Sequence, residues 1–199
     1  MKSPEDFLHF TLADLVTDIA QNAAESGAAL VELEIRETDR GAGGGPEFRF
    51  IVRDNGKGMS REELARAEDP FVTDGVKHPR RKIGLGIPFL IQTAAQSGGG
   101  WDCRSENEGE HHGTTVTAWF DVSNVDTPPA GDLPGMFRTI LLFEGPDDVH
   151  IRRVSEKENR LETEYEVRKS DLAEALGDLE DTQSLILLDQ YLRSLEEGD

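Results

Sequence analysis

The sequence predicts an α/β (α+β) fold: a two-layer sandwich in which helices cover one face of a mixed sheet, followed by a small C-terminal α+β appendage. Two observations support this prediction. Residues 11–27 carry apolar side chains at helical spacing, and residues 84–97 form an apolar helix bounded by glycines. Strand patterns lie between and after these helices, at residues 30–38, 48–54, 101–106 and 114–122.

The helix predicted at residues 11–27 has an apolar and a polar stripe. Thr11 is a suitable N-cap and Gly27 a suitable residue after the C-cap. The apolar stripe consists of Leu12, Leu15, Val16, Ile19 and Ala23, and the polar stripe of Asp14, Asp18, Asn22 and Glu25. Asp18 and Asn22 lie four positions apart, so their side chains share one face of the helix. We interpret Asp14 as a solvated surface acid, and Asp18 with Asn22 as a candidate site.

The strand at residues 48–54 ends in a carboxylate followed by two glycines. Asp54 precedes Gly56 and Gly58, which permit positive φ angles and a close approach of the backbone to a flat ligand. Asp54 would accept a hydrogen bond from a ligand amino group, with Met59 as an apolar wall. The alternative is an ordinary turn, because Asp-Asn-Gly is also common in hairpins.

Between Ser60 and the second apolar helix, the sequence predicts a short helix and then a loop. Ser60 to Glu63 resembles a capping box. Residues 68–82 have little periodicity and predict a mobile loop over the pocket. Four basic residues crowd into it within an acidic chain: Lys77, Arg80, Arg81 and Lys82. This suggests a bound anion nearby, and the alternative is a solvated basic loop.

The second apolar helix begins in a glycine-rich segment, from Gly84 to Ile87. Free backbone N–H groups at such a helix start form a natural seat for phosphate. Pro88 fits only in the first turn of a helix and so locates its beginning.

A turn-rich stretch at residues 126–134 predicts a boundary between a domain at residues 1–125 and an extension at residues 126–199. The extension is expected to hold an apolar helix or strand at residues 136–143, two hairpin strands and two helices. The strands are predicted at residues 150–154 and 161–167, and the helices at residues 170–177 and 184–195. The extension either docks on the main sheet, which we favour, or binds a partner.

Composition limits the possible partners and compartment. The chain of 199 residues has a net charge of −19, which disfavours nucleic acid and anionic membranes. It contains no apolar run of membrane-spanning length and no signal peptide, so a cytoplasmic location is expected. Cys103 is the single cysteine, which excludes an intrachain disulfide and a zinc cluster.

Four motifs in this order resemble the GHKL superfamily, the ATP-binding domains of histidine kinases, DNA gyrase, the ninety-kilodalton heat-shock chaperone and MutL. The resemblance covers about residues 10–122 and implies a Bergerat-type sandwich. Asp18-Ile-Ala-Gln-Asn22-Ala resembles the N box, and Asp54-Asn-Gly56-Lys-Gly58 the first glycine box. Gly84-Leu-Gly86-Ile resembles the second glycine box, and Gly113-Thr-Thr115 the Gly-Thr element.

This resemblance implies ATP and Mg²⁺ as cofactors. Asn22 would ligate Mg²⁺ jointly with the phosphates, and Asp54 would bind the adenine amino group with Thr115 supporting it through water. The remaining predicted contacts with the nucleotide are Glu25, Gly56, Gly58, Met59, Lys82, Gly84, Leu85, Gly86 and Ile87. The loop at residues 68–82 would act as a lid over the phosphates. Among its basic residues, Lys82 is the one expected to contact the phosphates, because it lies nearest Gly84 and Gly86.

Two departures from the family pattern shape the expected activity. Asp18 stands where several relatives carry a glutamate general base. The shorter side chain of Asp18 predicts slow ATP hydrolysis. The alternative is that Asp18 orients the metal ion and does not act as the base. No phosphoacceptor helix precedes residue 10, and no histidine lies in a phosphoacceptor box, so a complete sensor kinase is not expected.

The expected function is Mg²⁺-dependent ATP binding with slow hydrolysis or phosphoryl transfer to an unknown protein partner. The alternative is a catalytically weak, nucleotide-switched binding module that resembles an anti-sigma-factor regulator. A MutL-like repair role is disfavoured by the charge of −19 and by the missing downstream domain.

Overall fold

A computed structural model describes residues 10–39, 45–68, 86–109 and 112–197 of the chain. Its helices are α1 (Leu12–Glu25), α2 (Arg61–Glu68), α3 (Gly86–Gln96), α4 (Leu133–Leu141), α5 (Lys169–Leu176) and α6 (Thr182–Glu197). Its strands are β1 (Leu30–Asp39), β2 (Glu47–Asp54), β3 (Gly100–Glu106), β4 (Gly113–Asp121), β5 (Asp148–Lys157) and β6 (Arg160–Arg168). The loop predicted at residues 68–82 lies almost wholly outside the described residues.

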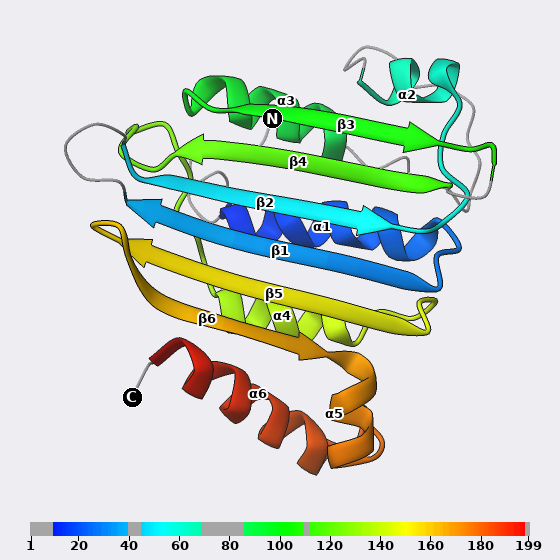
Figure 1. The fold of residues 1–199 in the computed structure, drawn as a ribbon, viewed down its shortest axis with the longest axis vertical. Coiled ribbons are helices and arrows are strands. Elements are labelled where there is room, and N and C mark those ends of the chain that lie inside the picture. Colours follow the sequence, from blue (N-terminus) through cyan, green and yellow to red (C-terminus); the bar gives the residue numbers. More distant parts are fainter. Residues whose placement is uncertain (1–9, 40–44, 69–85, 110–111, 198–199) are drawn as a thin grey trace, which may run out of the picture.

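The strands form one six-stranded mixed sheet in the order β3-β4-β2-β1-β5-β6. β5 runs parallel to β1, and the other neighbouring strands are antiparallel. Helices α1, α3 and α4 lie behind the sheet in Figure 1, so the predicted arrangement of helices on one face of a mixed sheet is confirmed.

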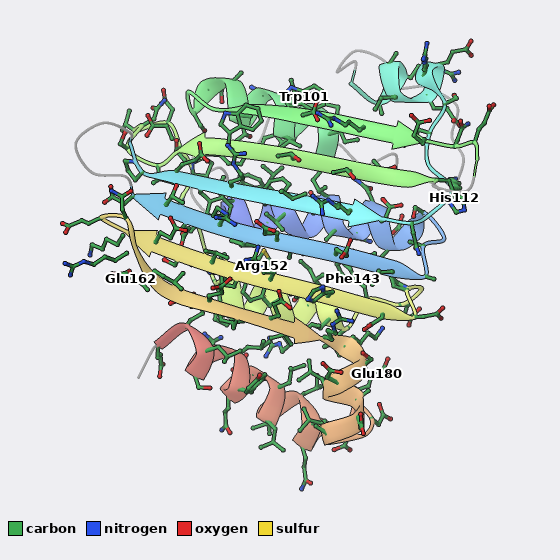
Figure 2. The ribbon with its side chains drawn as sticks, viewed as in Figure 1. Trp101, His112, Phe143, Arg152, Glu162 and Glu180 are labelled. Carbon is green, nitrogen blue, oxygen red and sulfur yellow. The ribbon has the colours of Figure 1, made fainter. Side chains whose placement is uncertain are left out.

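The core lies between this sheet and its helices. The apolar stripe of α1 is buried, as the periodicity predicts: Leu12, Leu15 and Val16 are fully covered. On the sheet side, Phe50 stacks on Phe120 with ring centroids 6.2 Å apart. The opposite face of the sheet is polar and half-exposed; Arg152 lies on it (Figure 2) and forms ion pairs with neighbouring glutamates.

The ends of α1 have the predicted caps, with one difference. Thr11 is the N-cap, and Gly27 follows the helix with a φ of 81°. Asp14 completes a capping box: its carboxylate accepts a hydrogen bond from the Thr11 backbone N–H at 2.9 Å. Asp14 is exposed, as the sequence predicts, and it also stabilises the helix start, a role that the interpretation as a solvated surface acid does not include.

The C-terminal part of the chain contributes to the same sheet and the same core. β5 pairs with β1 along its length, and apolar side chains of α4 and α6 join the core cluster. The segment that could be helix or strand is helix α4, and the predicted hairpin is β5 with β6. The division into domains at residues 1–125 and 126–199 stays a prediction.

A buried ionic cluster attaches α6 to the sheet. Arg153 on β5 is only 3% exposed, and its guanidinium pairs with Glu37 of β1 and with Glu196 of α6. The Tyr165 hydroxyl of β6 donates to Glu196 at 2.5 Å. Burial and this bond to a carboxylate raise the pKa of Tyr165, so the phenol stays protonated. Among the described residues, no helix has the length and apolar content needed to cross a membrane.

Candidate functional site

The candidate site lies where α1 and β2 end on the same side of the molecule. β2 ends at Asp54, and the C-cap of α1 is Ser26. In Figure 2, His112 marks this end of the sheet, where β2 ends and β4 begins. The chain thus brings the end of the N-box-like helix next to the first glycine motif.

Asp54 is half-buried and is held by three donors. Its Oδ1 accepts hydrogen bonds from the Ser26 hydroxyl at 3.0 Å and from the Gly56 N–H at 2.9 Å. Burial raises the pKa of Asp54, and this effect is opposed by the bonds from Gly56, Ser26 and the Thr114 backbone. A half-buried carboxylate with a raised pKa is a candidate binding or catalytic group, although its bond from the Gly56 N–H is also the bond of an Asx turn.

The turn after Asp54 has room for glycine only. A Cβ at Gly56 would lie 1.8 Å from Ser26 Oγ, and one at Gly58 would lie 1.9 Å from the carbonyl oxygen of Glu106. Gly58 also has a φ of 64°. The next backbone N–H, that of Met59, donates to Ser105 Oγ of β3 at 2.8 Å. The turn is therefore fastened to α1 on one side and to β3 on the other.

The strand register corrects the prediction for Thr115. Asp54 pairs directly with Thr114, whereas Thr115 pairs with Arg53. Directly paired residues in an antiparallel sheet point to the same face, and their neighbours point to the other face. Thr114 therefore lies on the Asp54 side of the sheet, and Thr115 lies on the open side, away from Asp54.

The polar stripe of α1 faces the start of α3. A Cβ at Gly86 would lie 3.5 Å from Asn22 Nδ2 and 3.5 Å from Asp18 Cβ, so the second glycine motif contacts the N-box-like pair. Asp18 is exposed, yet its pKa is raised, first by partial desolvation and then by the negative charge of Asp14. Asn22 is half-buried beside it.

The structure describes only some of the other predicted site residues. Glu25 is exposed, and its carboxylate accepts a hydrogen bond from Gln21 at 2.9 Å. Ile87 is half-buried in the first turn of α3 and packs against the core. Lys82, Gly84 and Leu85 lie outside the described residues, and so does the predicted lid.

Three residues around the turn were not among the predicted site residues. Ser26 and Ser105 bond to the turn as described above, and His112 Nδ1 bonds to the carbonyl oxygen of Gly56. These contacts join residues far apart in the chain, so no local sequence motif predicts them.

The polar groups and the backbone shape of this site fit a nucleotide and a magnesium ion. The Asp54 carboxylate suits an amino group, and the Cβ-free turn beside it suits a flat base. The start of α3 carries no acidic residue in its first turn and suits phosphate. Among the described residues there is no group of three or more His, Cys, Asp or Glu side chains that could hold a metal ion. Mg²⁺ at Asn22 would therefore depend on phosphate oxygens, as is common for this ion.

Comparison with known proteins identifies relatives of this chain. The model of the histidine kinase-, DNA gyrase B- and HSP90-like ATPase family matches residues 4–124. The chain is 31% identical over 136 residues to the DNA mismatch repair protein MutL of Thermus aquaticus, an alignment that covers 68% of this chain and 24% of MutL. The chain thus spans about a quarter of the length of that relative.

Two solved structures are also similar. One is the Aquifex aeolicus MutL ATPase domain complexed with ADP, with 16% identity and a TM-score of 0.36, over 82% of this chain and 63% of that chain. The other is the N-terminal domain of a DNA repair protein, with 13% identity and a TM-score of 0.47, over 86% of this chain and 58% of that chain.

Proposed function

Because the chain belongs to the histidine kinase-, DNA gyrase B- and HSP90-like ATPase family, we propose that it binds ATP with Mg²⁺ and hydrolyses it slowly or transfers its phosphoryl group to a partner protein. The observation that carries this proposal is the Asp54 carboxylate, half-buried at a turn in which Gly56 leaves room for no side chain. Such a group accepts a hydrogen bond from the adenine amino group.

The remaining roles follow from the two ends of the site. Asn22 supplies an amide oxygen for Mg²⁺, which neutralises phosphate charge when bound. The backbone N–H groups at the start of α3, from Gly86 to Ile87, bind phosphate at the positive end of the helix dipole. Lys82, Gly84 and Leu85 complete this phosphate seat in the proposal.

Asp18 is the proposed general base. It lies on the same helix face as Asn22 and beside Gly86. Its raised pKa improves its ability to accept a proton from water, because an effective base has a pKa closer to the working pH. Aspartate is one methylene shorter than glutamate, and a displacement of about 1 Å can cost on the order of 10²-fold in rate, so we expect slow turnover.

A nucleotide-switched binding module is the second candidate function. It is favoured by an exposed apolar surface on α6, where Ile186, Leu187 and Tyr191 are 54%, 51% and 44% exposed. Leu187 and Tyr191 lie four positions apart on one helix face, next to the face that buries Leu188 and Leu192. In this function, nucleotide binding changes the affinity for a protein partner without useful turnover.

The partner is proposed to be a protein in the cytoplasm. A net charge of −19 opposes binding to phosphate backbones. The similarity to a DNA mismatch repair protein argues the other way, so the experiments include duplex DNA. Binding of labelled duplex at low salt would overturn this part of the proposal.

The decisive experiment is calorimetry of the full chain with ADP and with ATP in the presence of Mg²⁺. We expect binding in the wild type and its loss in Asp54→Ala, with no loss in Asp102→Ala, an exposed carboxylate on the outer face of β3. Absence of binding in the wild type, or intact binding in Asp54→Ala, would refute the proposal. Incubation with γ-labelled ATP and a candidate partner then separates the two functions: labelled partner indicates a kinase, and ATP-dependent co-elution without label indicates a switch.

A further inference from the structure

Ser26 joins three parts of the candidate site. It is the C-cap of α1, and its hydroxyl lies 2.8 Å from the carbonyl oxygen of Ala23 and 3.0 Å from Asp54 Oδ1. Its own carbonyl oxygen accepts the Lys57 N–H at 3.3 Å. One residue therefore connects the helix that carries Asn22 to the turn that follows Asp54.

The hydroxyl of Ser26 determines how the Asp54 carboxylate is presented. Two donors converge on Oδ1, the Ser26 hydroxyl at 3.0 Å and the Gly56 N–H at 2.9 Å. Hydrogen bonds from two fixed donors to one oxygen restrict rotation of the carboxylate and favour its ionised form. The Thr114 backbone is a third donor to the same carboxylate, so the whole group is held in one orientation as an acceptor for a ligand.

Gly56 and Ser26 are matched to each other in space. A Cβ at position 56 would lie 1.8 Å from Ser26 Oγ and 2.6 Å from Ser26 Cβ. The serine side chain thus occupies the volume that any side chain at position 56 would need. The glycine therefore lets Ser26 reach Asp54.

We propose that Ser26 is a positioning residue that sets base specificity, by holding Asp54 as an oriented acceptor that prefers a purine with a 6-amino group to one with a 6-oxo group. The inference rests on the proposed function, because it assumes that Asp54 contacts the base. An oriented carboxylate accepts from an amino group and repels an oxygen at the same position. Without the Ser26 donor, Asp54 can rotate, and its protonated form can donate to the oxygen.

The test compares ADP with inosine diphosphate, which carries oxygen in place of the amino group. Calorimetry of the full chain with Mg²⁺ gives the affinity ratio for the two nucleotides in wild type and in Ser26→Ala. A hydrogen bond to a charged group typically changes an equilibrium about tenfold or more. We expect the preference for ADP to fall about tenfold in Ser26→Ala, mainly through weaker ADP binding.

Ser194→Ala is the matched control. Ser194 Oγ on α6 donates to the Tyr191 carbonyl oxygen three positions earlier at 2.7 Å, and Ser26 Oγ lies at a similar 2.8 Å from the carbonyl oxygen of Ala23. The single hydroxyl proton of Ser26 goes to Asp54 in the proposal, whereas no carboxylate bond to Ser194 is present among the described residues. It should leave the nucleotide preference unchanged. Ser26→Thr retains a hydroxyl and should retain most of the preference. If Ser26→Ala does not fold, Ser26→Cys, whose thiol is a weaker donor, provides the same comparison.

The outcomes separate this inference from the proposed function. A wild type that binds neither nucleotide overturns both. A wild type that prefers ADP, together with a Ser26→Ala variant that folds and keeps the same preference, overturns only the role of Ser26. A uniform loss of affinity for both nucleotides in Ser26→Ala also overturns it, because a purely structural role would produce that result.

Discussion

Gly58 provides the sharpest test of how the candidate site is built. It has a φ of 64°, and a Cβ at this position would lie 1.9 Å from the carbonyl oxygen of Glu106 and 2.5 Å from its carbonyl carbon. Replacing Gly58 by alanine therefore imposes two costs. The backbone is held in the left-handed region, and the new methyl group collides with the backbone of β3, which cannot rotate away as a side chain can.

The two costs can be separated with a second glycine. Gly177 has a φ of 77°, but a Cβ there would meet nothing within 4 Å. Gly177 has a ψ of −133°, so Gly177→Ala should cost only a strained backbone conformation, about 1–3 kcal/mol. Gly58→Ala should cost a similar amount for its positive φ plus about 1–3 kcal/mol for overpacking, or about 2–6 kcal/mol in total.

Urea unfolding of both variants measures these costs as changes in the free energy of unfolding. Calorimetry with ADP adds the functional consequence: Gly58→Ala should weaken binding because the turn that places Asp54 shifts, and Gly177→Ala should not. Equal destabilisation by the two substitutions would show that β3 does not constrain the turn. Unaltered ADP affinity in a destabilised Gly58→Ala would show that the turn does not place the binding group.

Three further predictions follow from the charged groups. Asp18→Asn should slow single-turnover ATP hydrolysis by on the order of 10²-fold or more without abolishing ADP binding; equal rates would remove Asp18 from the role of base. Because burial raises the pKa of Asp54, its contribution to stability is present at low pH and is lost as the pH rises through that pKa. As the pH rises above the usual aspartate range, Asp54→Asn should therefore gain stability relative to wild type in urea unfolding, and a difference independent of pH would contradict the raised pKa. Arg153→Ala should cost about 3–5 kcal/mol because it leaves two carboxylates without their buried cation. Arg160→Ala, at the exposed first residue of β6, should change stability by less than about 0.5 kcal/mol.

The parts of the fold that could be predicted are those in which local pattern and burial agree. α1 has caps at both ends and one apolar stripe, so its position follows from the sequence. The sequence predicts β5 only over residues 150–154, whereas the strand extends over Asp148–Lys157. Adjacent arginines interrupt its alternation, and Arg153 is nevertheless buried because two carboxylates neutralise it. A buried charge with distant partners leaves no local signal.

The site shows the same limit at the level of single residues. Thr114 and Thr115 are chemically identical neighbours, and only the register of β4 against β2 decides which of them lies beside Asp54. A shift of one residue would exchange their faces. Ser26 contacts Asp54 across 28 positions of sequence. The first assignment required the strand register, and the second required the packing of the end of α1 beside β2; motif spacing supplies neither.

The electrostatics of the site argue that it is organised for a ligand rather than for stability. The pKa values of Asp18 and Asp54 are both raised, so at neutral pH the fold holds two carboxylates in surroundings that disfavour their charge. Three donors converge on Asp54 and reduce this cost without removing it. A turn built only for stability would place an uncharged acceptor there. The retained charge matches what a cationic metal and an amino group require, and stability is provided elsewhere, in the apolar layer between the helices and the sheet.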